Sequence, residues 1–259
     1  MKKSKIAVIV AMVVVLAFSL AACGGSDKSS SDKTVYKVGT EPTFPPFDTT
    51  DEDQNIVGLD MDLIKAIGED QGFDVEFENL SFDGLIPALK AGNIDIVAAG
   101  MNKDDEDRQK EVDFSDSYYE SKLFVAVTED NTTIKSVEDL TPDMKVAAQT
   151  GTTGASKVKE LKDAGKIKEA VILDGLDTCM MKLINGDVSA VINDKPVTEA
   201  YMKKQPDKIK MVGEALNAEN YGFAVQKGNA ELVEKINNGL KNIKENGTYD
   251  KLVDEWFNK

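Results

Sequence analysis

Histidine is absent from the 259-residue sequence, and this absence limits the chemistry that the chain can perform. Without histidine there is no Ser-His-Asp or Cys-His nucleophile, the commonest general base near neutral pH is missing, and most zinc sites are excluded. No run of acidic residues has the spacing of a metal site. An enzymatic function is therefore disfavoured, and we expect no cofactor and no metal.

Cysteine is nearly absent, and each of the two cysteines has a simple explanation. Cys179 lies in the apolar run Cys179–Met181 and is expected to be a small core residue. Cys23 follows Leu20-Ala21-Ala22, which resembles a bacterial lipobox, where the leader is cleaved before the cysteine and the thiol then carries lipid. The alternative is an ordinary signal peptide in which Cys23 has no role. The folded body keeps one cysteine, so no intramolecular disulfide is expected.

Basic residues are outnumbered, with 31 lysines and arginines against 46 acidic residues and a formal net charge of -15. Such a chain repels phosphate backbones, so nucleic acid is not an expected partner. Arginine is used only once, at Arg108. A guanidinium grips a carboxylate through two parallel hydrogen bonds, which lysine cannot do. Arg108 therefore either holds a carboxylate or is a stray surface arginine, and residue type alone does not decide between them.

The N-terminus carries a targeting segment that is not part of the fold. Met1–Lys5 is basic, and the apolar run that follows is short for a membrane-spanning helix. We predict a lipoprotein signal peptide over residues 1–22 and a flexible tether over residues 23–33, because the tether has no apolar side chain after Cys23. Acyl chains on Cys23 would hold the mature protein at the extracytoplasmic face of the cell membrane.

The body contains an internal repeat. Asp83–Val97 and Asp177–Val191 both read as a short helix, a glycine stop and an apolar strand with a polar end. Upstream of each lie a strand, a helix and another strand, so each half is predicted to be strand, helix, strand, helix, strand. This alternation predicts an α/β fold of two lobes, each a mixed, mostly parallel sheet flanked by helices, with ligands bound outside the carboxyl ends of the strands.

The C-terminal part has no counterpart in the repeat. We predict a strand over Tyr221–Val225, a helix over Ala230–Glu245 and a last helix that holds Trp256 and Phe257. This tail is expected to complete the first lobe, so that two strands, near 122–128 and 219–225, join the lobes as a hinge. The predicted domains are lobe 1 over residues 34–124 with 220–259, and lobe 2 over residues 125–219.

Six stretches of the body carry a resemblance to a known family, and together, in this order and spacing, they are specific. They are Gly39–Phe47, Gly58–Leu63, Ser81–Pro87, Val112–Asp116, Gln149–Gly154 and Glu245–Tyr249. With them the chain, from about Val35 to Phe257, resembles the amino-acid-binding proteins of ABC importers, the extracellular solute-binding family with a type II periplasmic-binding-protein fold. The resemblance implies a protein that captures a free amino acid and delivers it to a cognate ABC permease.

The resemblance assigns roles to the two charged ends of the ligand. In the family, the arginine at the place of Arg108 clamps the α-carboxylate, with help from Thr152 and Thr153 at a helix start. The aspartate at the place of Asp194 takes the α-ammonium, with the Gly100 carbonyl and the Asn102 side chain as further acceptors. The alternative for Asp194 is an N-cap of the helix after Pro196, and both roles can coexist.

Other residues are expected to hold and select the ligand side chain. Phe44 and Phe82 match the two aromatic positions that sandwich this side chain in the family, whereas Phe47 is expected to pack in the core. Glu41 and Gln149 end the first strand of each half and face the same cavity. An acidic side chain would meet Glu41, so we predict a polar or basic L-amino acid such as lysine, arginine, ornithine, glutamine or cystine.

The expected mechanism is hinge closure, in which the ligand joins the two lobes into the form that docks on the permease. We expect a monomer. Two other functions remain open from the sequence. One is an enzyme of the same fold, such as a dehydratase, with Glu41 and Asp194 as its carboxylates. The other is a surface adhesin or sensor.

Overall fold

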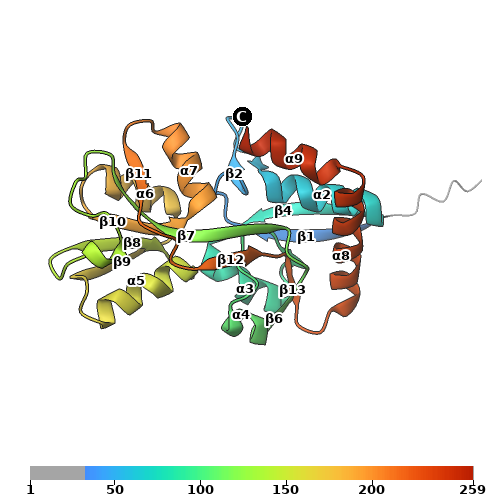
Figure 1. Ribbon diagram of the computed structural model, residues 1–259. Helices are drawn as coiled ribbons and strands as arrows, with labels where there is room; N and C mark the ends of the chain where they lie inside the picture. Colours follow the sequence, from blue (N-terminus) through green and yellow to red (C-terminus); the bar gives the residue numbers. More distant parts are fainter. Residues whose placement is uncertain (1–32, 259) are drawn as a thin grey trace, which may run out of the picture. The chain divides into compact units, whose positions relative to one another are not determined.

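Two β-sheets organise the body of the chain in the computed structural model, which describes residues 33–258 (Figure 1). The first sheet has the strand order β4-β1-β5-β13-β6. In it β1 runs parallel to β4 and β5, while β13 runs antiparallel to β5 and β6. Its strands are β1 (Thr34–Thr40), β4 (Phe73–Asn79), β5 (Ile96–Val97), β6 (Val112–Phe114) and β13 (Ala224–Gln226). We call the part of the chain built on this sheet the first lobe.

The second sheet has the order β11-β7-β10-β8-β9 and is the base of the second lobe. Here β8 runs parallel to β9 and β10, while β7 runs antiparallel to β10 and β11. Its strands are β7 (Tyr119–Thr128), β8 (Lys145–Gln149), β9 (Glu169–Leu173), β10 (Ala190–Asp194) and β11 (Ile209–Val212). A separate two-stranded sheet joins β2 (Thr49–Thr50) to β3 (Ile56–Val57).

The repeat predicted from the sequence is present in both sheets. In the first lobe β1 lies between β4 and β5, and in the second lobe β8 lies between β9 and β10. In each lobe these three strands run parallel. The first strand of each repeat unit is thus central, with the second strand on its outer side and the third on its inner side. Gly92 and Gly186 both take positive φ, of 73° and 77°, where the helices before them end. A side chain is strained there, which explains the glycine in each copy.

Helices cover the first sheet, and their apolar faces form its core. α2 (Leu59–Gln71) buries residues at helical spacing, among them Leu63, Ile64 and Ile67, in the same core cluster as Ile236 and Leu240 of α8. Figure 1 shows α2, α8 and α9 together on this lobe. The remaining bounds are α3 (Phe82–Ala91), α4 (Glu106–Glu111), α8 (Ala230–Glu245) and α9 (Thr248–Phe257).

The second lobe has its own helices. They are α5 (Thr153–Asp163), α6 (Leu176–Ile184), α7 (Lys195–Lys204) and the 3-10 turn η1 (Val137–Asp139). Val158 of α5 packs on Val146 and Ile192 of the sheet, and Cys179 of α6 is fully buried, as expected for a core residue.

Two antiparallel strands join the lobes, as predicted, but their bounds differ from the prediction. The start of β7 pairs with β12 (Ala218–Tyr221), while the rest of β7 pairs with β10 and β11 (Figure 1). The single strand predicted over Tyr221–Val225 is wrong, because β12 ends at Tyr221 and β13 begins at Ala224. Between them, Gly222 N–H donates to Met101 O and Phe223 N–H to Ser115 Oγ, which interrupts the ladder.

Some predictions fall on residues that the structure does not describe. The signal peptide over 1–22, the tether before Lys33 and the lipid anchor at Cys23 lie outside residues 33–258. The division into lobes at residues 124 and 219 stays a prediction. Within the described residues, no helix has the length and apolar character needed to cross a membrane.

Candidate functional site

A small polar cavity gathers the residues that the sequence singled out. It is lined by both lobes, and its volume is about 10 Å³, enough for about one water molecule. Its walls are Phe44, Phe82, Gly100, Asn102, Arg108, Gln149, Thr152, Thr153, Asp194 and Glu219. All the predicted ligand-binding residues except Glu41 are among them, and Glu219 is the one that the sequence did not indicate.

A larger surface groove is a less suitable site. It has a volume of about 920 Å³ and lies between α7 and α9, with Pro196, Met202, Trp256 and Phe257 in its walls. None of the predicted site residues lines it. The small cavity brings a buried guanidinium and buried carboxylates together, so we take it as the functional site.

Arg108 is held in place by the helix that carries it. α4 begins after Asp105, whose side chain caps the helix by accepting from Asp107 N–H and Arg108 N–H at 3.0 Å each. The acidic run before Arg108 therefore lies at a helix N-terminus, where negative charge is favourable. Arg108 is 9% exposed, which excludes the alternative that it is a stray arginine on the surface.

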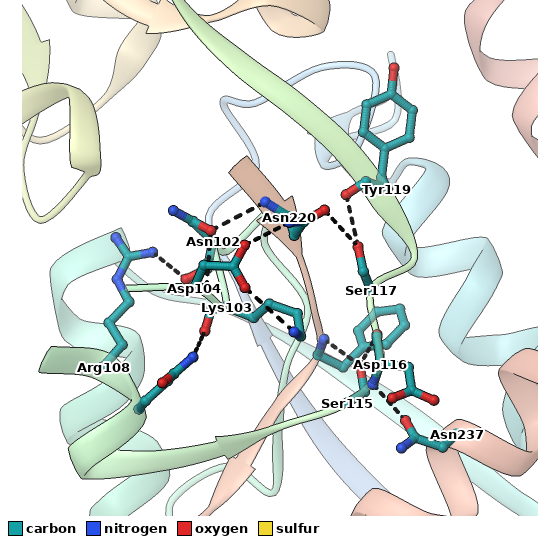
Figure 2. Close-up of polar contacts among 12 residues, drawn as sticks. Asn102, Lys103, Asp104, Arg108, Ser115, Asp116, Ser117, Tyr119, Asn220 and Asn237 are labelled. Carbon is teal, nitrogen blue, oxygen red and sulfur yellow. Dashed lines mark hydrogen bonds and ion pairs between the residues drawn. The ribbon is translucent and has the colours of Figure 1, made fainter. Parts of the chain in front are cut away.

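The guanidinium spans both lobes. Nη1 donates to Asn102 O at 3.2 Å (Figure 2). Nη2 donates to Gly151 O of the second lobe at 2.9 Å, and the guanidinium lies 5.4 Å from the centre of the Phe82 ring. Burial lowers the pKa of Arg108, an effect that Asp105, Glu219 and Asp194 oppose. The side chain stays charged, because arginine titrates far above neutral pH.

Asp194 lies opposite Arg108, at the end of β10. Its Oδ1 accepts from Ser121 Oγ at 3.0 Å and from the Tyr221 hydroxyl. Asp194 occupies the N-cap position of α7, but its side chain makes no capping hydrogen bond, so the predicted coexistence of both roles is wrong. The side chain turns to the cavity because β7 and β12 offer it hydroxyl donors. Burial, and next the neighbouring Glu219, raise the pKa of Asp194 well above its ordinary value.

Glu219 is a second acid beside Asp194. It lies in β12, directly opposite Ser121 of β7, and is 2% exposed. Its Oε1 accepts from Asn217 Nδ2 at 3.2 Å. The sequence placed Glu219 in a crossing strand but gave no sign of the face on which it points. The available signal was its position two residues before Tyr221, because alternate residues of a strand share a face.

Gly100 and Phe44 fit closely against one another. Gly100 has a φ of 52°, and a Cβ there would lie 2.6 Å from Phe44 Cε1. Phe44 is 7% exposed and lines the cavity together with Phe82, whereas Phe47 is fully buried, as predicted. Position 100 therefore requires glycine for two reasons: the positive φ is favourable for glycine, and a side chain would collide with the Phe44 ring.

Gln149 connects the cavity to Glu41. Its Nε2 donates to Glu41 Oε2 at 2.7 Å and to Asp174 O at 2.9 Å. Thr43 Oγ1 donates to the same Glu41 oxygen at 2.8 Å. Burial raises the pKa of Glu41, and these two donors partly offset the rise. Glu41 thus lies one side chain behind the cavity wall, at the end away from Asp194.

Thr152 and Thr153 lie at the start of α5, the helix start expected from the sequence. Thr152 is its N-cap, since Oγ1 accepts from Ala155 N–H at 3.0 Å, and this hydroxyl donates to Gln149 O at 2.7 Å. Its hydroxyl proton is therefore already used within the protein.

A buried pair of carboxyl groups lies behind the cavity. Asp60 Oδ2 accepts from Gly100 N–H at 2.8 Å and from the Tyr118 hydroxyl at 2.7 Å, and Asp48 Oδ2 accepts from Thr40 Oγ1 at 2.7 Å. Among the described residues, Asp48 Oδ1 and Asp60 Oδ1 are the buried side-chain oxygens that lack a hydrogen-bond partner. Burial raises the pKa of Asp60 to about 7, and burial and Asp60 raise that of Asp48 well above its ordinary value. The raised pKa values mean that this pair keeps a proton at a pH where free aspartates would have lost it, which lowers the charge buried around the two unpartnered oxygens.

The two lobes touch around the cavity. Besides the Arg108 and Gln149 bonds, Thr43 of the first lobe accepts from Leu176 N–H at its Oγ1, at 3.1 Å, and its carbonyl accepts from the Tyr201 hydroxyl at 3.0 Å. Since the cavity is too small for an amino acid, the lobes must move apart before one can enter. The β7–β12 pair is the connection about which they can do so.

Comparisons with known proteins fit this architecture. Residues 36–259 match the family described as bacterial extracellular solute-binding proteins, family 3. The chain belongs to this family. Among family 3 relatives, a probable histidine-binding protein of Neisseria gonorrhoeae is 34% identical over 97% of this chain and 95% of its own length.

Two further matches are named as arginine-binding proteins. A putative ABC transporter arginine-binding protein 2 of Escherichia coli (strain K12) is 34% identical over 91% of this chain and 96% of its own length. A solved structure, an ancestral arginine-binding protein bound to arginine, has a TM-score of 0.82 and 45% identity, covering 87% of this chain and 99% of that one. The predicted family and the two-lobed periplasmic-binding-protein fold are thereby confirmed. Within the described residues, no group of three histidine, cysteine, aspartate or glutamate side chains could hold a metal ion.

Proposed function

We propose that this family 3 protein captures a free L-amino acid in the cavity between its lobes and hands it to an ABC permease. The observation that carries the proposal is the pairing of one buried guanidinium, Arg108, with the buried carboxylate Asp194 across a cavity shared by both lobes. An amino acid has one carboxylate and one ammonium at its α-carbon. Each group needs a partner of opposite charge once water is excluded.

Binding is coupled to hinge closure through exchange of hydrogen bonds. Arg108 donates to the carbonyls of Asn102 and Gly151 in the structure, and a ligand carboxylate would replace the Gly151 carbonyl of the second lobe. A charge-assisted, two-pronged bond is stronger than a bond to a neutral carbonyl. The ligand then stabilises the closed form because several of its contacts exist only when the lobes meet.

The proposed ligand carries a basic or polar side chain. Asp194, Glu219 and Glu41 place three acidic groups at or near a cavity that holds one cation, Arg108. The α-groups of a zwitterion cancel one another, so a positive side chain near Glu41 would reduce the remaining excess of negative charge. The relatives named for histidine and arginine support this preference.

The test is a thermal-shift screen of free amino acids with the purified protein, because a ligand that binds only the folded state raises its melting temperature. L-Arginine, L-lysine and L-histidine are expected to stabilise the protein, and L-glutamate to have no effect. Glu41→Gln should reduce the preference for basic over amide side chains, while Glu52→Gln, at an exposed loop position, should not. No shift with any free amino acid would refute the proposed function.

The remaining parts of the function concern location and partners. We propose that Cys23 carries the lipid that anchors the protein at the extracytoplasmic face, supported by the lipobox-like Leu20–Cys23. Cys23→Ala should then release the protein from the membrane fraction. We also propose that the protein is a monomer that binds without a chemical step, since its named relatives are binding proteins. Native mass spectrometry would give the oligomeric mass and any co-purified amino acid.

A further inference from the structure

Two acids stand side by side where the family has one recognised ammonium partner. Asp194 and Glu219 both line the same small cavity and are 5% and 2% exposed. Burial, and next the neighbouring Glu219, raise the pKa of Asp194 well above its ordinary value, because two negative charges side by side in a buried site repel one another. Asp194 therefore keeps a proton in the closed, ligand-free arrangement at a pH where a free aspartate would have lost it.

The acceptor that the family resemblance assigns beside Asp194 is already engaged. Asn102 Oδ1 accepts from Asp104 N–H at 3.1 Å and from Asn220 N–H at 3.2 Å, the latter contact being visible in Figure 2. An amide oxygen has two lone pairs, and both are used to hold the loop against β12. An α-ammonium, which has three N–H donors, must find another acceptor.

Glu219 is an available acceptor. Its neighbour in the sequence, Asn220, anchors Asn102, while Glu219 itself lies among the cavity walls. Asp194 Oδ1 is engaged by Ser121 and Tyr221 on the side of β7 and β12. Its second oxygen, the Gly100 carbonyl and Glu219 are therefore the acceptors considered for the three N–H groups of an ammonium.

We propose that Glu219 is a second carboxylate of the α-ammonium subsite, and that capture of the amino acid expels the proton that Asp194 holds beside it. The inference rests on the proposed function, since it needs an amino acid in this cavity. The O–H bond of the carboxyl breaks, the proton leaves to solvent, and two N–H groups of the ammonium donate to the two carboxylates. A positive charge in contact with the pair favours its fully ionised form.

Few other titratable groups face this pair. Arg108 of α4 acts on both acids through its charge, and Tyr221 of β12 donates to Asp194 and is held neutral by a raised pKa. Glu41 stands at the other end of the site and has a raised pKa of its own, so it can add to the proton count. The other charged side chains on the surrounding elements are exposed or half-buried; they are Lys103, Asp104, Asp105, Glu120, Lys122 and Lys195.

The sign of the pH dependence follows from the direction of proton flow. The free site holds a proton that the complex does not, so raising the pH favours the complex. Affinity should rise by up to about tenfold per pH unit while the free pair is protonated, and should level off once the pair is ionised without ligand.

The experiment is isothermal titration calorimetry of the purified protein with L-arginine in phosphate and in Bis-Tris, both of which buffer in mildly acidic solution, at matched pH. The two buffers differ in ionisation enthalpy, so the difference between the observed enthalpies counts the protons released on binding. We expect a release of about one proton in mildly acidic solution. Glu219→Gln should remove most of this release, flatten the pH dependence and weaken binding by about tenfold at neutral pH.

Control variants separate the possible outcomes. Glu120→Gln changes the same residue type on the paired hinge strand at an exposed position and should keep the wild-type proton count. Glu41→Gln measures the contribution of the other end of the site. Binding without proton release, or release that persists in Glu219→Gln, overturns the inference but leaves the proposed function standing. Absence of any binding heat with L-arginine contradicts the proposed function itself.

Discussion

The pair Asp48 and Asp60 should make the protein less stable as the pH rises towards neutrality. Asp60 anchors Gly100 N–H and the Tyr118 hydroxyl, and the native pair retains a proton that the unfolded chain would already have lost. The native pKa is raised, so its stabilising contribution is complete below the unfolded pKa and is lost as the pH rises through the native one. The window therefore runs from the ordinary 3.8 to about 7.

The perturbation is Asp60→Asn, which imitates the protonated form. The amide oxygen can accept from Gly100 and Tyr118, and the neutral amide places no charge in the buried site. The shift of Asp60 from 3.8 to about 7 corresponds to roughly 4 kcal/mol of pH-dependent stability. The variant should escape most of this loss, and at neutral pH it should be the more stable protein.

The assay is urea unfolding followed by circular dichroism at a series of pH values across this window. Other buried acids also titrate, so the informative quantity is the difference in unfolding free energy between variant and wild type at each pH. Asp53→Asn, at an exposed loop position, is the matched control and should track the wild type. A difference for Asp60→Asn that stays constant with pH, or that grows in favour of the wild type as the pH rises, would refute the proton retained by the pair.

Four further substitutions test the site, the backbone and the core. Arg108→Lys keeps the charge but loses the fork that donates to two oxygens, so calorimetry should show L-arginine binding weakened by about 1 to 3 kcal/mol, and equal affinity would contradict the clamp. Gly100→Ala should push Phe44 aside and reduce binding, while Gly92→Ala, with positive φ but no atom within 4 Å of its Cβ, should lower stability by about 1 kcal/mol and leave binding unchanged. Phe47→Ala removes a fully buried ring in edge contact with Tyr119 and Tyr221, and should lower the unfolding free energy by about 3 to 5 kcal/mol in urea titrations; a loss below about 1 kcal/mol would show that the site repacks.

The sequence predicted the lobes well because their determinants are local. Each unit of the repeat has an apolar strand, a helix with apolar residues at helical spacing, and a glycine that stops it, and these signals lie within a few residues of one another. Parallel strands end at one edge of a sheet, so the polar residues after β1, β5, β8 and β10 could be expected to meet. Asp194 was placed at the site in this way, whereas Arg108 stood out as the only arginine and received its role from the family resemblance.

The residues that the sequence did not reveal depend on contacts between distant segments. Glu219 faces the cavity only because β12 pairs with β7 in one register, and a shift by one residue would turn it away. Asp48 resembles any loop acid until the fold places it beside Asp60. The strand predicted across Gly222 is interrupted because the backbone N–H groups of residues 222 and 223 donate to Met101 and Ser115 instead of to a neighbouring strand. Both acceptors lie more than a hundred residues earlier in the chain.

Because the chain has a single guanidinium, chemical modification of that group can report on the opening of the lobes. Reagents such as phenylglyoxal, which modify arginine selectively, can react with this protein only at Arg108. That side chain is 9% exposed when the lobes touch, so its labelling rate would measure how often they separate. Added amino acid should slow the labelling in proportion to occupancy, and mass spectrometry of the intact protein would then follow opening and closing without any engineered dye or cysteine.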